Sequence, residues 1–241
     1  MYKVNPRVDL AFKKIFGVEE NKDLLISLIN SIVSEKDQVK EVTLLNPYNP
    51  KNFLNDKLSV LDIKAKGESG KMFNIEIQIT DEADYDKRAL NYWAKLYAGQ
   101  LKEGSRYSEL NKTIGIHILN FTGINTNKYH NIFQLRENES GIKYFEDIEL
   151  HTIELNKFAD NAKEELSDII KKIKNALDIW VAFLTRNDLL NKDKLPKELN
   201  SKELKKALNV LEVINLTDEE REEYENRLNW LRIETSAVIK S

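Results

Sequence analysis

Residues 58–80, LSVLDIKAKGESGKMFNIEIQIT, contain the pattern from which the fold can be predicted. They contain two runs in which apolar and polar side chains alternate, residues 58–66 and 71–80, and such alternation is typical of strands with one buried face. The segment GESG between them supplies two glycines, as tight hairpin turns require. The pattern therefore predicts an antiparallel β-hairpin whose other face carries acidic side chains.

The register of this hairpin follows from the position of its turn. A turn centred on Ser69 pairs Lys64 with Asn74. The same register places Asp62 directly opposite Glu76. Side chains in such positions have Cβ atoms roughly 5 Å apart, and two like charges there repel each other. A divalent cation between the carboxylates removes this repulsion, because Mg²⁺ takes hard oxygen ligands and often uses only one or two carboxylates.

Two interpretations of the acidic pair remain open at this point. In the first, Asp62 and Glu76 hold a metal ion, and the Gln78 amide on the same face orients a water molecule or a phosphate oxygen. In the second, the acids belong to an ordinary solvent-exposed hairpin face, and neighbouring lysines neutralise them. A register shift of one residue would also separate the two acids.

Helical and strand-like segments surround the hairpin. The apolar spacing predicts helices at 6–17, 21–33 and 82–101, and strands at 39–46, 113–121, 131–137 and 147–155. From about residue 160 onward the spacing is helical, and Thr217 and Glu220 have the spacing of a capping box before a last helix. The acidic run at 218–225 is typical of a solvated helix face. The order of elements predicts an α/β core with a C-terminal helical extension.

Composition restricts the class of protein. The 241 residues include no cysteine, which excludes disulfides and thiolate metal sites and suits a reducing compartment such as the cytoplasm. The net charge of −3 excludes a strongly basic nucleic-acid-binding surface, so DNA binding would require a local patch. The longest apolar run, residues 179–184, is too short to span a bilayer, and the N-terminus lacks the apolar segment of a signal peptide. We therefore expect no membrane association.

Histidines and aromatic residues add little to the functional prediction. The three histidines lack the spacing of a zinc site. His117 alternates with isoleucines, which favours a position in or at the edge of the core, and His130 and His151 receive no role. Trp93 and Tyr97 share the apolar face of the helix predicted at 82–101, so we expect them to pack inward.

The motif order along the chain resembles a known nuclease family. Asp62, followed after thirteen residues by Glu76, Ile77 and Gln78, resembles the PD-(D/E)XK signature, with glutamine where lysine is usual. Further segments carry the resemblance to the Rpn family, the recombination-promoting nucleases also described as PD-(D/E)XK transposases: NPRVDLAFKKIFG (5–17), KLSVLDIKAKGESGKMFNIEIQI (57–79), KRALNYWAKLYAGQLKEGSRYSEL (87–110) and TIGIHILNF (113–121). The resemblance covers roughly residues 5–158.

The resemblance implies a fold and an activity. The fold is a restriction-endonuclease-like mixed-sheet core, αβββαβ, at residues 1–158, followed by a helical extension at 159–241. The activity is that of a DNA endonuclease that depends on Mg²⁺ or Mn²⁺ and acts in recombination or transposition. By position, Asp62 and Glu76 match the metal-binding acids and the Ile77 carbonyl matches a further ligand.

The resemblance also assigns residues around the metal. Gln78 matches the third catalytic position. Asp9 matches an acid on the first helix that can approach the site, and its spacing to Lys13 equally fits an ordinary helix ion pair. Arg88 and Tyr92 lie on one helix face and match positions that can reach a phosphate, while Tyr92 also fits the edge of the core. Lys13 is a candidate for contacts with the DNA backbone.

Three hypotheses for the function follow. The first is the metal-dependent DNA endonuclease. The second is a catalytically weak or inactive nuclease-like module that binds DNA or a protein, because Gln78 lacks the positive charge with which lysine stabilises a transition state. The third is a scaffold that forms a homo-oligomer through the C-terminal helices.

Overall fold

One mixed sheet organises the chain in the computed structural model, which describes residues 4–48, 62–81, 84–159, 164–214 and 216–238, with side chains up to residue 232. Within these ranges six strands lie in the order β1-β2-β3-β4-β6-β5. The strands are β1 (Val42–Leu44), β2 (Ile63–Gly67), β3 (Met72–Gln78), β4 (Thr113–Leu119), β5 (His130–Gln134) and β6 (Ile148–Glu154). β1, β2 and β3 are antiparallel neighbours, β3, β4 and β6 run parallel, and β5 returns antiparallel to β6.

The predicted hairpin is formed by β2 and β3, and its register is confirmed. Lys64 pairs with Asn74, as a turn centred on Ser69 requires. The Gly67 N–H donates to the Lys71 carbonyl at 2.9 Å and closes the turn. Gly70 has φ 88°, a conformation that side chains other than hydrogen disfavour. Residues 58–61 of the predicted first strand lie outside the described residues.

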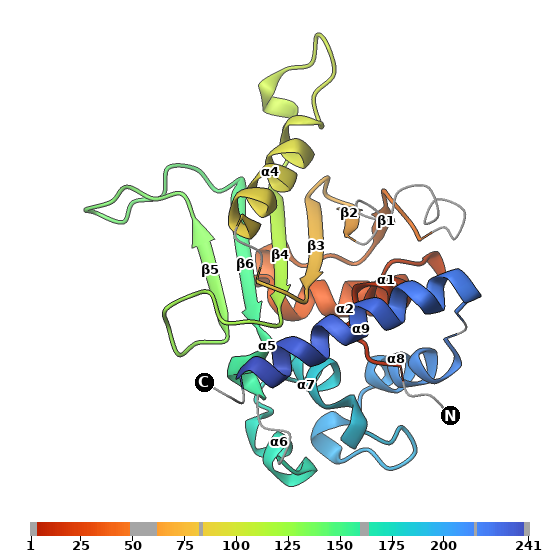
Figure 1. Cartoon of the computed structure of the whole chain (residues 1–241). Coiled ribbons are helices and arrows are strands. Elements are labelled where there is room, and N and C mark those ends of the chain that lie inside the picture. Colours follow the sequence, from red (N-terminus) through yellow and green to blue (C-terminus); the bar gives the residue numbers. More distant parts are fainter. Residues whose placement is uncertain (1–3, 49–61, 82–83, 160–163, 215, 239–241) are drawn as a thin grey trace.

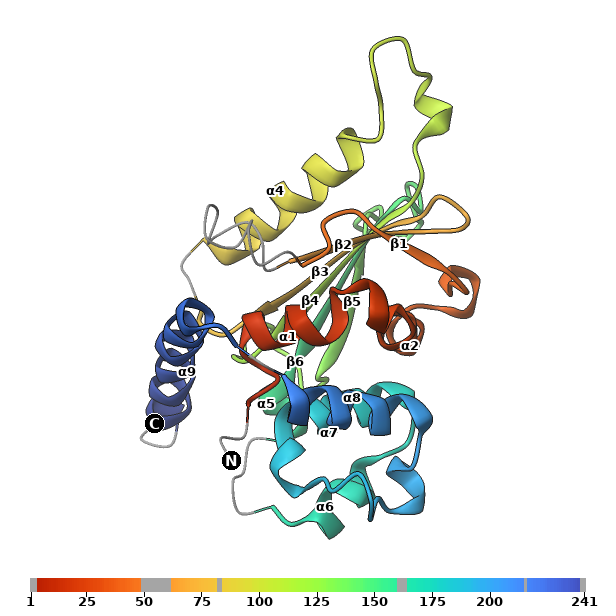
Figure 2. The same ribbon diagram turned by 90° about the vertical axis from the view of Figure 1, so that its right-hand side faces the viewer.

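Helices cover both faces of the sheet, which explains why every residue of β4 is buried. α4 (Tyr85–Ala98) lies on one face, and α1 (Asp9–Phe16) and α2 (Lys22–Ile32) lie on the other (Figures 1 and 2). The helices predicted at 6–17, 21–33 and 82–101 are therefore confirmed with slightly shorter ends. β4 is the central strand that its uninterrupted apolar pattern predicted.

The C-terminal part of the chain adds a further group of helices. They are α5 (Leu155–Phe158), α6 (Leu166–Lys172), α7 (Ala176–Arg186), α8 (Lys202–Val213) and α9 (Asp218–Val238). α7 and α8 pack against α2, and α9 contacts α1. None of the described helices is long and apolar enough to cross a membrane.

The hydrophobic core is continuous across the boundary predicted at residue 158. Phe16 of α1 packs edge-on against Trp180 of α7, with ring centroids 5.3 Å apart. The Trp180 indole N–H donates to Ser27 Oγ of α2 at 3.3 Å. Buried side chains of α8 and α9 belong to the same apolar cluster as those of α1 and α2. The parts of the chain on either side of the predicted boundary therefore share one core. The division itself, into residues 1–158 and 159–241, stays a prediction.

The start of α9 shows one success and one error of the sequence interpretation. The capping box is confirmed: Thr217 N–H donates to Glu220 Oε2 at 2.8 Å, and Glu220 N–H donates to Thr217 Oγ1 at 3.2 Å. The prediction of a solvated acidic face is wrong for Glu220, which is buried and forms an ion pair with Lys14 at 2.6 Å. The Tyr48 hydroxyl also donates to Glu220. Because α9 packs on α1, its first turn is enclosed.

Candidate functional site

The two predicted metal-binding acids lie at the same end of the hairpin. The register pairs Ile63 with Ile75, and one further residue along each strand places Asp62 opposite Glu76. Glu76 and Gln78 lie on the sheet face that α4 covers, because both contact Arg88 of that helix. Lys64 Nζ lies 3.2 Å from Asp62 Oδ2, so the side chains of Lys64 and Asp62 project from the same face of the sheet. Asp62 itself precedes β2 and is nine-tenths buried.

Contacts from other elements fix the backbone at Asp62. The Asn46 side chain donates to the Asp62 main-chain oxygen and to Oδ1, both at 3.1 Å, and accepts from Lys64 N–H at 2.7 Å. Lys13 of α1 donates through Nζ to the main-chain oxygens of Asn46 and Asp62. Burial lowers the pKa of Lys13 to about 8. Lys13 therefore anchors the residue that enters β2, and its predicted contact with DNA would require it to leave these oxygens.

Glu76 and Gln78 share a cation from α4. Arg88 Nη2 donates to Gln78 Oε1 at 3.0 Å and lies 3.8 Å from Glu76 Oε1. The guanidinium also lies over the Tyr85 ring, 5.5 Å from its centroid. The Gln78 amide donates in turn to the Thr80 carbonyl at 3.1 Å. The arrangement places a fixed positive charge beside the position where the signature usually has lysine.

A buried tyrosine–histidine pair lies beside these residues. Tyr85, the first residue of α4, and His117 of β4 form a hydrogen bond of 3.0 Å between Oη and Nδ1. His117 is the register partner of Glu76 on the neighbouring strand, so their side chains are adjacent on one sheet face. The expectation that His117 lies in the core is confirmed, since it is 3% exposed.

Asp9 lies at the start of α1, and its carboxylate bonds to α9. Arg227 Nη1 donates to Asp9 Oδ2, and the Leu10 N–H donates to Oδ1 at 2.8 Å. The alternative of an Asp9–Lys13 ion pair is wrong, because Lys13 bonds to the main-chain oxygens of Asn46 and Asp62. Burial raises the pKa of Asp9 to about 6, and the Arg227 guanidinium opposes this rise.

The remaining aromatic candidates lie on α4. Trp93 is buried as predicted, and its indole N–H donates to the Thr113 carbonyl at 2.8 Å. Tyr97 stacks on Trp93 with ring centroids 5.1 Å apart. Tyr92 is half-buried, one turn beyond Arg88 on the same helix. Its position is compatible both with the edge of the core and with contact to a phosphate.

The oxygen donors at the hairpin end suit a hard divalent cation. In the described part of the chain, no group of three or more His, Cys, Asp or Glu side chains is arranged to hold a metal ion. The donor set is smaller: two carboxylates, Asp62 and Glu76, with the Ile77 main-chain oxygen on the same strand. Mg²⁺ and Mn²⁺ accept such oxygens and complete their shells with water and substrate. Lys64 and Arg88 balance the two carboxylates in the structure described here.

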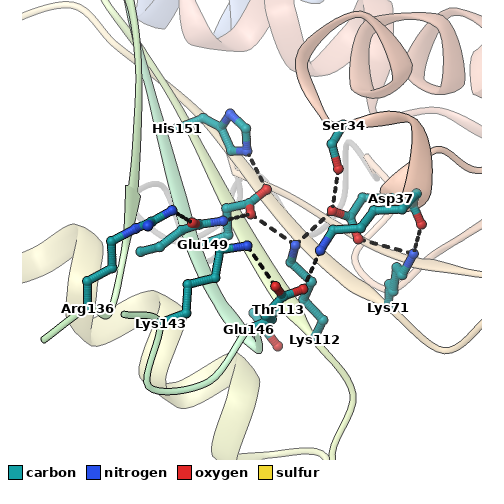
Figure 3. A network of polar contacts seen from close by, with 12 residues as sticks. Ser34, Asp37, Lys71, Lys112, Thr113, Arg136, Lys143, Glu146, Glu149 and His151 are labelled. Atoms are coloured by element: carbon teal, nitrogen blue, oxygen red, sulfur yellow. Dashed lines mark hydrogen bonds and ion pairs between the residues drawn. The ribbon is translucent and has the colours of Figure 1, made fainter. Parts of the chain in front are cut away.

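A second polar cluster lies where β3, β4 and β6 begin (Figure 3). Lys112 Nζ lies 2.7 Å from Asp37 Oδ2 and 3.0 Å from Glu149 Oε2. Lys71 forms a further ion pair with Asp37 at 3.1 Å, and His151 Nε2 lies 2.9 Å from Glu149 Oε1. Burial opposes ionisation of Glu149, but hydrogen bonds from His151, Lys112 and Gln134 outweigh it and lower its pKa to about 2.

His130 extends this cluster to the edge strand. Its Nε2 lies 2.9 Å from His151 Nδ1, and the two rings stack with centroids 5.2 Å apart. The sequence assigned no role to either histidine, because their contact depends on the pairing of β5 with β6. A partial signal was present in the two-residue spacing of Glu149 and His151, which puts both on one face of a strand.

Site residues that the sequence interpretation missed come from outside the hairpin. Two of them are Asn46 and Tyr85. The contact of the Arg88 guanidinium with Gln78 was also missed. Tyr85 and Arg88 are three residues apart in a predicted helix, so their shared face was available as a signal. Asn46 gave no such signal, since its contact with Asp62 is set by the tertiary fold.

The fold and the site together define a class of protein. A mixed α/β sheet whose hairpin presents Asp62, Glu76 and Gln78 in this order is the restriction-endonuclease-like fold of PD-(D/E)XK nucleases. The model of the PD-(D/E)XK nuclease family transposase matches residues 6–240, and the chain belongs to this family. The match extends past the predicted core into α9, so the C-terminal helices are part of the family pattern. Comparisons with curated proteins and with solved structures gave no match.

Proposed function

We propose that the protein is a divalent-metal-dependent DNA endonuclease that hydrolyses phosphodiester bonds in recombination or transposition. The observation that carries the proposal is the hairpin register, which brings Asp62 and Glu76 to one end of one sheet face. Family membership supports a nuclease-related role with DNA as substrate. Asp62, Glu76 and the Ile77 carbonyl would hold Mg²⁺ or Mn²⁺.

Arg88 supplies the charge that Gln78 lacks. Lysine at the third position of the signature would stabilise the negative charge that develops on the phosphate. Here the Gln78 carbonyl oxygen orients the Arg88 guanidinium, which contributes a planar, permanently charged donor suited to phosphate oxygens. The missing lysine therefore does not by itself favour the inactive module.

Each residue then has a separate role. When bound, the metal ion would polarise the phosphate and lower the pKa of the attacking water. Gln78 would orient Arg88 and the substrate, and Tyr92 would contact the phosphate from the next turn of α4. Asp9 would support the site from α1, provided that Arg227 releases it. Assembly through the C-terminal helices stays a prediction.

Cleavage of supercoiled plasmid tests this function. With Mg²⁺ or Mn²⁺ the wild-type chain should nick or linearise the plasmid, and Asp62→Asn and Glu76→Gln should each lower the rate by about 10²–10³-fold or more, as loss of a group that stabilises developing charge does. Glu139→Gln, a change at an exposed acid far along the chain, is the matched control and should cut at the wild-type rate.

The same assay separates the alternatives. Binding of DNA without any metal-dependent cutting would favour the nuclease-like binding module. Cutting that survives both Asp62→Asn and Glu76→Gln would exclude the proposed site. Folding of all variants should be checked by circular dichroism, so that a lost activity is not a lost fold.

A further inference from the structure

Arg7 lies two residues before the start of α1, and its side chain reaches the end of β4. The Arg7 Nη1 donates to Asn120 Oδ1 at 2.9 Å. Asn120 follows the last residue of β4, and its main-chain N–H donates to the Gln78 carbonyl at 3.0 Å. A single residue therefore connects the Arg7 guanidinium to the third position of the signature.

The bond between Arg7 and Asn120 joins the α1 layer to the end of the sheet. Leu119, the last residue of β4, packs with Tyr85 and Ala89 of α4 in one apolar cluster. Asn120 instead accepts from Arg7, which comes from the start of α1 on the opposite face of the sheet (Figure 2). Asn120 is 4% exposed, so its amide is a buried anchor for the guanidinium.

The backbone at Arg7 is also held in place. The Arg7 main-chain N–H donates to Asn5 Oδ1 at 3.0 Å, and the Asn5 N–H donates to the Tyr224 hydroxyl of α9 at 2.7 Å. Arg7 is half-buried, so part of the residue reaches the surface. A donor that the fold has already fixed loses little conformational entropy when it binds a ligand.

Two guanidinium groups thus approach the end of β3 from the two faces of the sheet. Arg88 donates to the Gln78 side chain from α4, and Arg7 is linked to the Gln78 carbonyl through Asn120. The Asn120 oxygen is a neutral acceptor, which orients the Arg7 guanidinium without cancelling its charge. Arginine binds phosphate oxygens through parallel N–H groups. A DNA strand carries one negative charge per about 3.4 Å of helix axis, so neighbouring phosphates can meet cations on both sides of a cleavage site.

We propose that Arg7 is a substrate-binding residue that contacts a DNA phosphate next to the one that is cleaved. The inference rests on the proposed function and deepens it, since it assigns a contact with the DNA backbone outside the metal-binding hairpin. In a chain with a net charge of −3, two arginines that the fold brings together supply the local positive patch that DNA binding requires.

Binding of a short labelled DNA duplex to the full chain, measured by fluorescence anisotropy in EDTA at several salt concentrations, tests this contact. Each phosphate contact contributes about 0.9 to the slope of log K against log[salt], so Arg7→Gln should lower the magnitude of the slope by about 0.9. Arg7→Lys should keep the slope and bind less tightly, because lysine retains the charge without the planar guanidinium. Arg136→Gln, at an exposed arginine two residues beyond β5, changes the net charge equally and should keep the wild-type slope.

A second variant keeps the test decisive if Arg7→Gln does not fold. Asn120→Asp retains Arg7 but places a carboxylate against its guanidinium, so the slope should fall as in Arg7→Gln, and circular dichroism shows which variants are folded. A wild-type slope in these folded variants, or an equal fall in Arg136→Gln, would overturn the contact, while plasmid cleavage by the wild type would leave the proposed function standing. A wild-type chain that binds no duplex would instead overturn DNA as the substrate, and the inference with it.

Discussion

Both ends of the sheet carry acidic side chains, but different contacts neutralise them at each end. Where β3, β4 and β6 begin, Asp37 and Glu149 share Lys112 at 2.7 and 3.0 Å (Figure 3). At the far end of β3, Glu76 Oε1 lies 3.8 Å from Arg88 Nη2. Removing one partner of a buried ion pair is costly, because it leaves the other charge buried without compensation.

This difference indicates that the two clusters have different roles. Lys112 connects the short turn that contains Asp37 to β6, so the first cluster fastens the α2–β1 connection to the sheet. At the hairpin end, Lys13 and Asn46 donate to the Asp62 main-chain oxygen, and Asn46 also donates to Asp62 Oδ1. We therefore expect changes in the first cluster to affect stability and changes in the second to affect activity.

Lys112→Met should have the largest effect on stability. It leaves Asp37 and Glu149 buried without their shared cation, and breaking a buried pair from one side costs about 3–5 kcal/mol. Urea unfolding should show this loss, while the folded fraction should still cut plasmid at the wild-type rate. Lys36→Met is the control, because its ion pair with Glu146 is solvent-exposed and should be worth about 1 kcal/mol or less. Similar losses in both variants would contradict the comparison.

Acid should protonate His117 and Glu149 in different pH ranges. The pKa of His117 falls from 6.5 to about 4 on folding, so the unfolded chain binds the extra proton and stability declines as the pH drops from about 6.5 to 4. This amounts to on the order of 3 kcal/mol at full effect. The pKa of Glu149 falls from 4.5 to about 2, so its contribution is lost only below pH 4.5.

The variant His117→Leu isolates the contribution of His117 to the pH dependence of stability. His130 has its pKa lowered to about 4 and contributes in the same range from the other cluster. Thermal unfolding between pH 7 and 4 should therefore be less pH-dependent in His117→Leu than in the wild type, but not independent of pH. An unchanged slope in this range would show that His117 is not buried as a neutral group.

The sequence could predict what is local and could not predict what depends on the packing of distant elements. The turn glycines and the alternation of residues 58–80 are local, and they were enough to predict the pairing of Lys64 with Asn74. The hydrogen bond from Arg88 to Gln78 depends on how α4 lies over the sheet, and the spacing of residues along the chain does not give that position. The burial of Glu220 likewise depends on the crossing of α9 over α1, so its acidic neighbours suggested a solvated face.

Arg88→Met should lower activity more than stability. The variant loses the charge that Gln78 orients, and removing one donor to a developing negative charge costs about 10²-fold in rate or more. Arg88→Lys should recover part of the rate, since a lysine keeps the charge without the planar geometry. Lys87→Met, at an exposed neighbour that forms an ion pair with exposed Asp84, is the control and should cut normally. Equal losses at positions 87 and 88 would indicate a general effect on α4.

Ser34→Ala should have the smallest effect and tests how finely the first cluster is balanced. Ser34 Oγ donates to Asp37 Oδ2 at 2.8 Å, and loss of one such bond at an exposed residue costs about 1 kcal/mol. The control is Ser31→Ala, whose hydroxyl donates to Leu28 O within α2, so its removal should be neutral or slightly stabilising. Urea midpoints of the two variants should therefore differ although the substitutions are chemically identical. Equal midpoints would mean that Lys112 and Lys71 alone hold Asp37, because the serine then adds nothing to a carboxylate that two lysines already saturate.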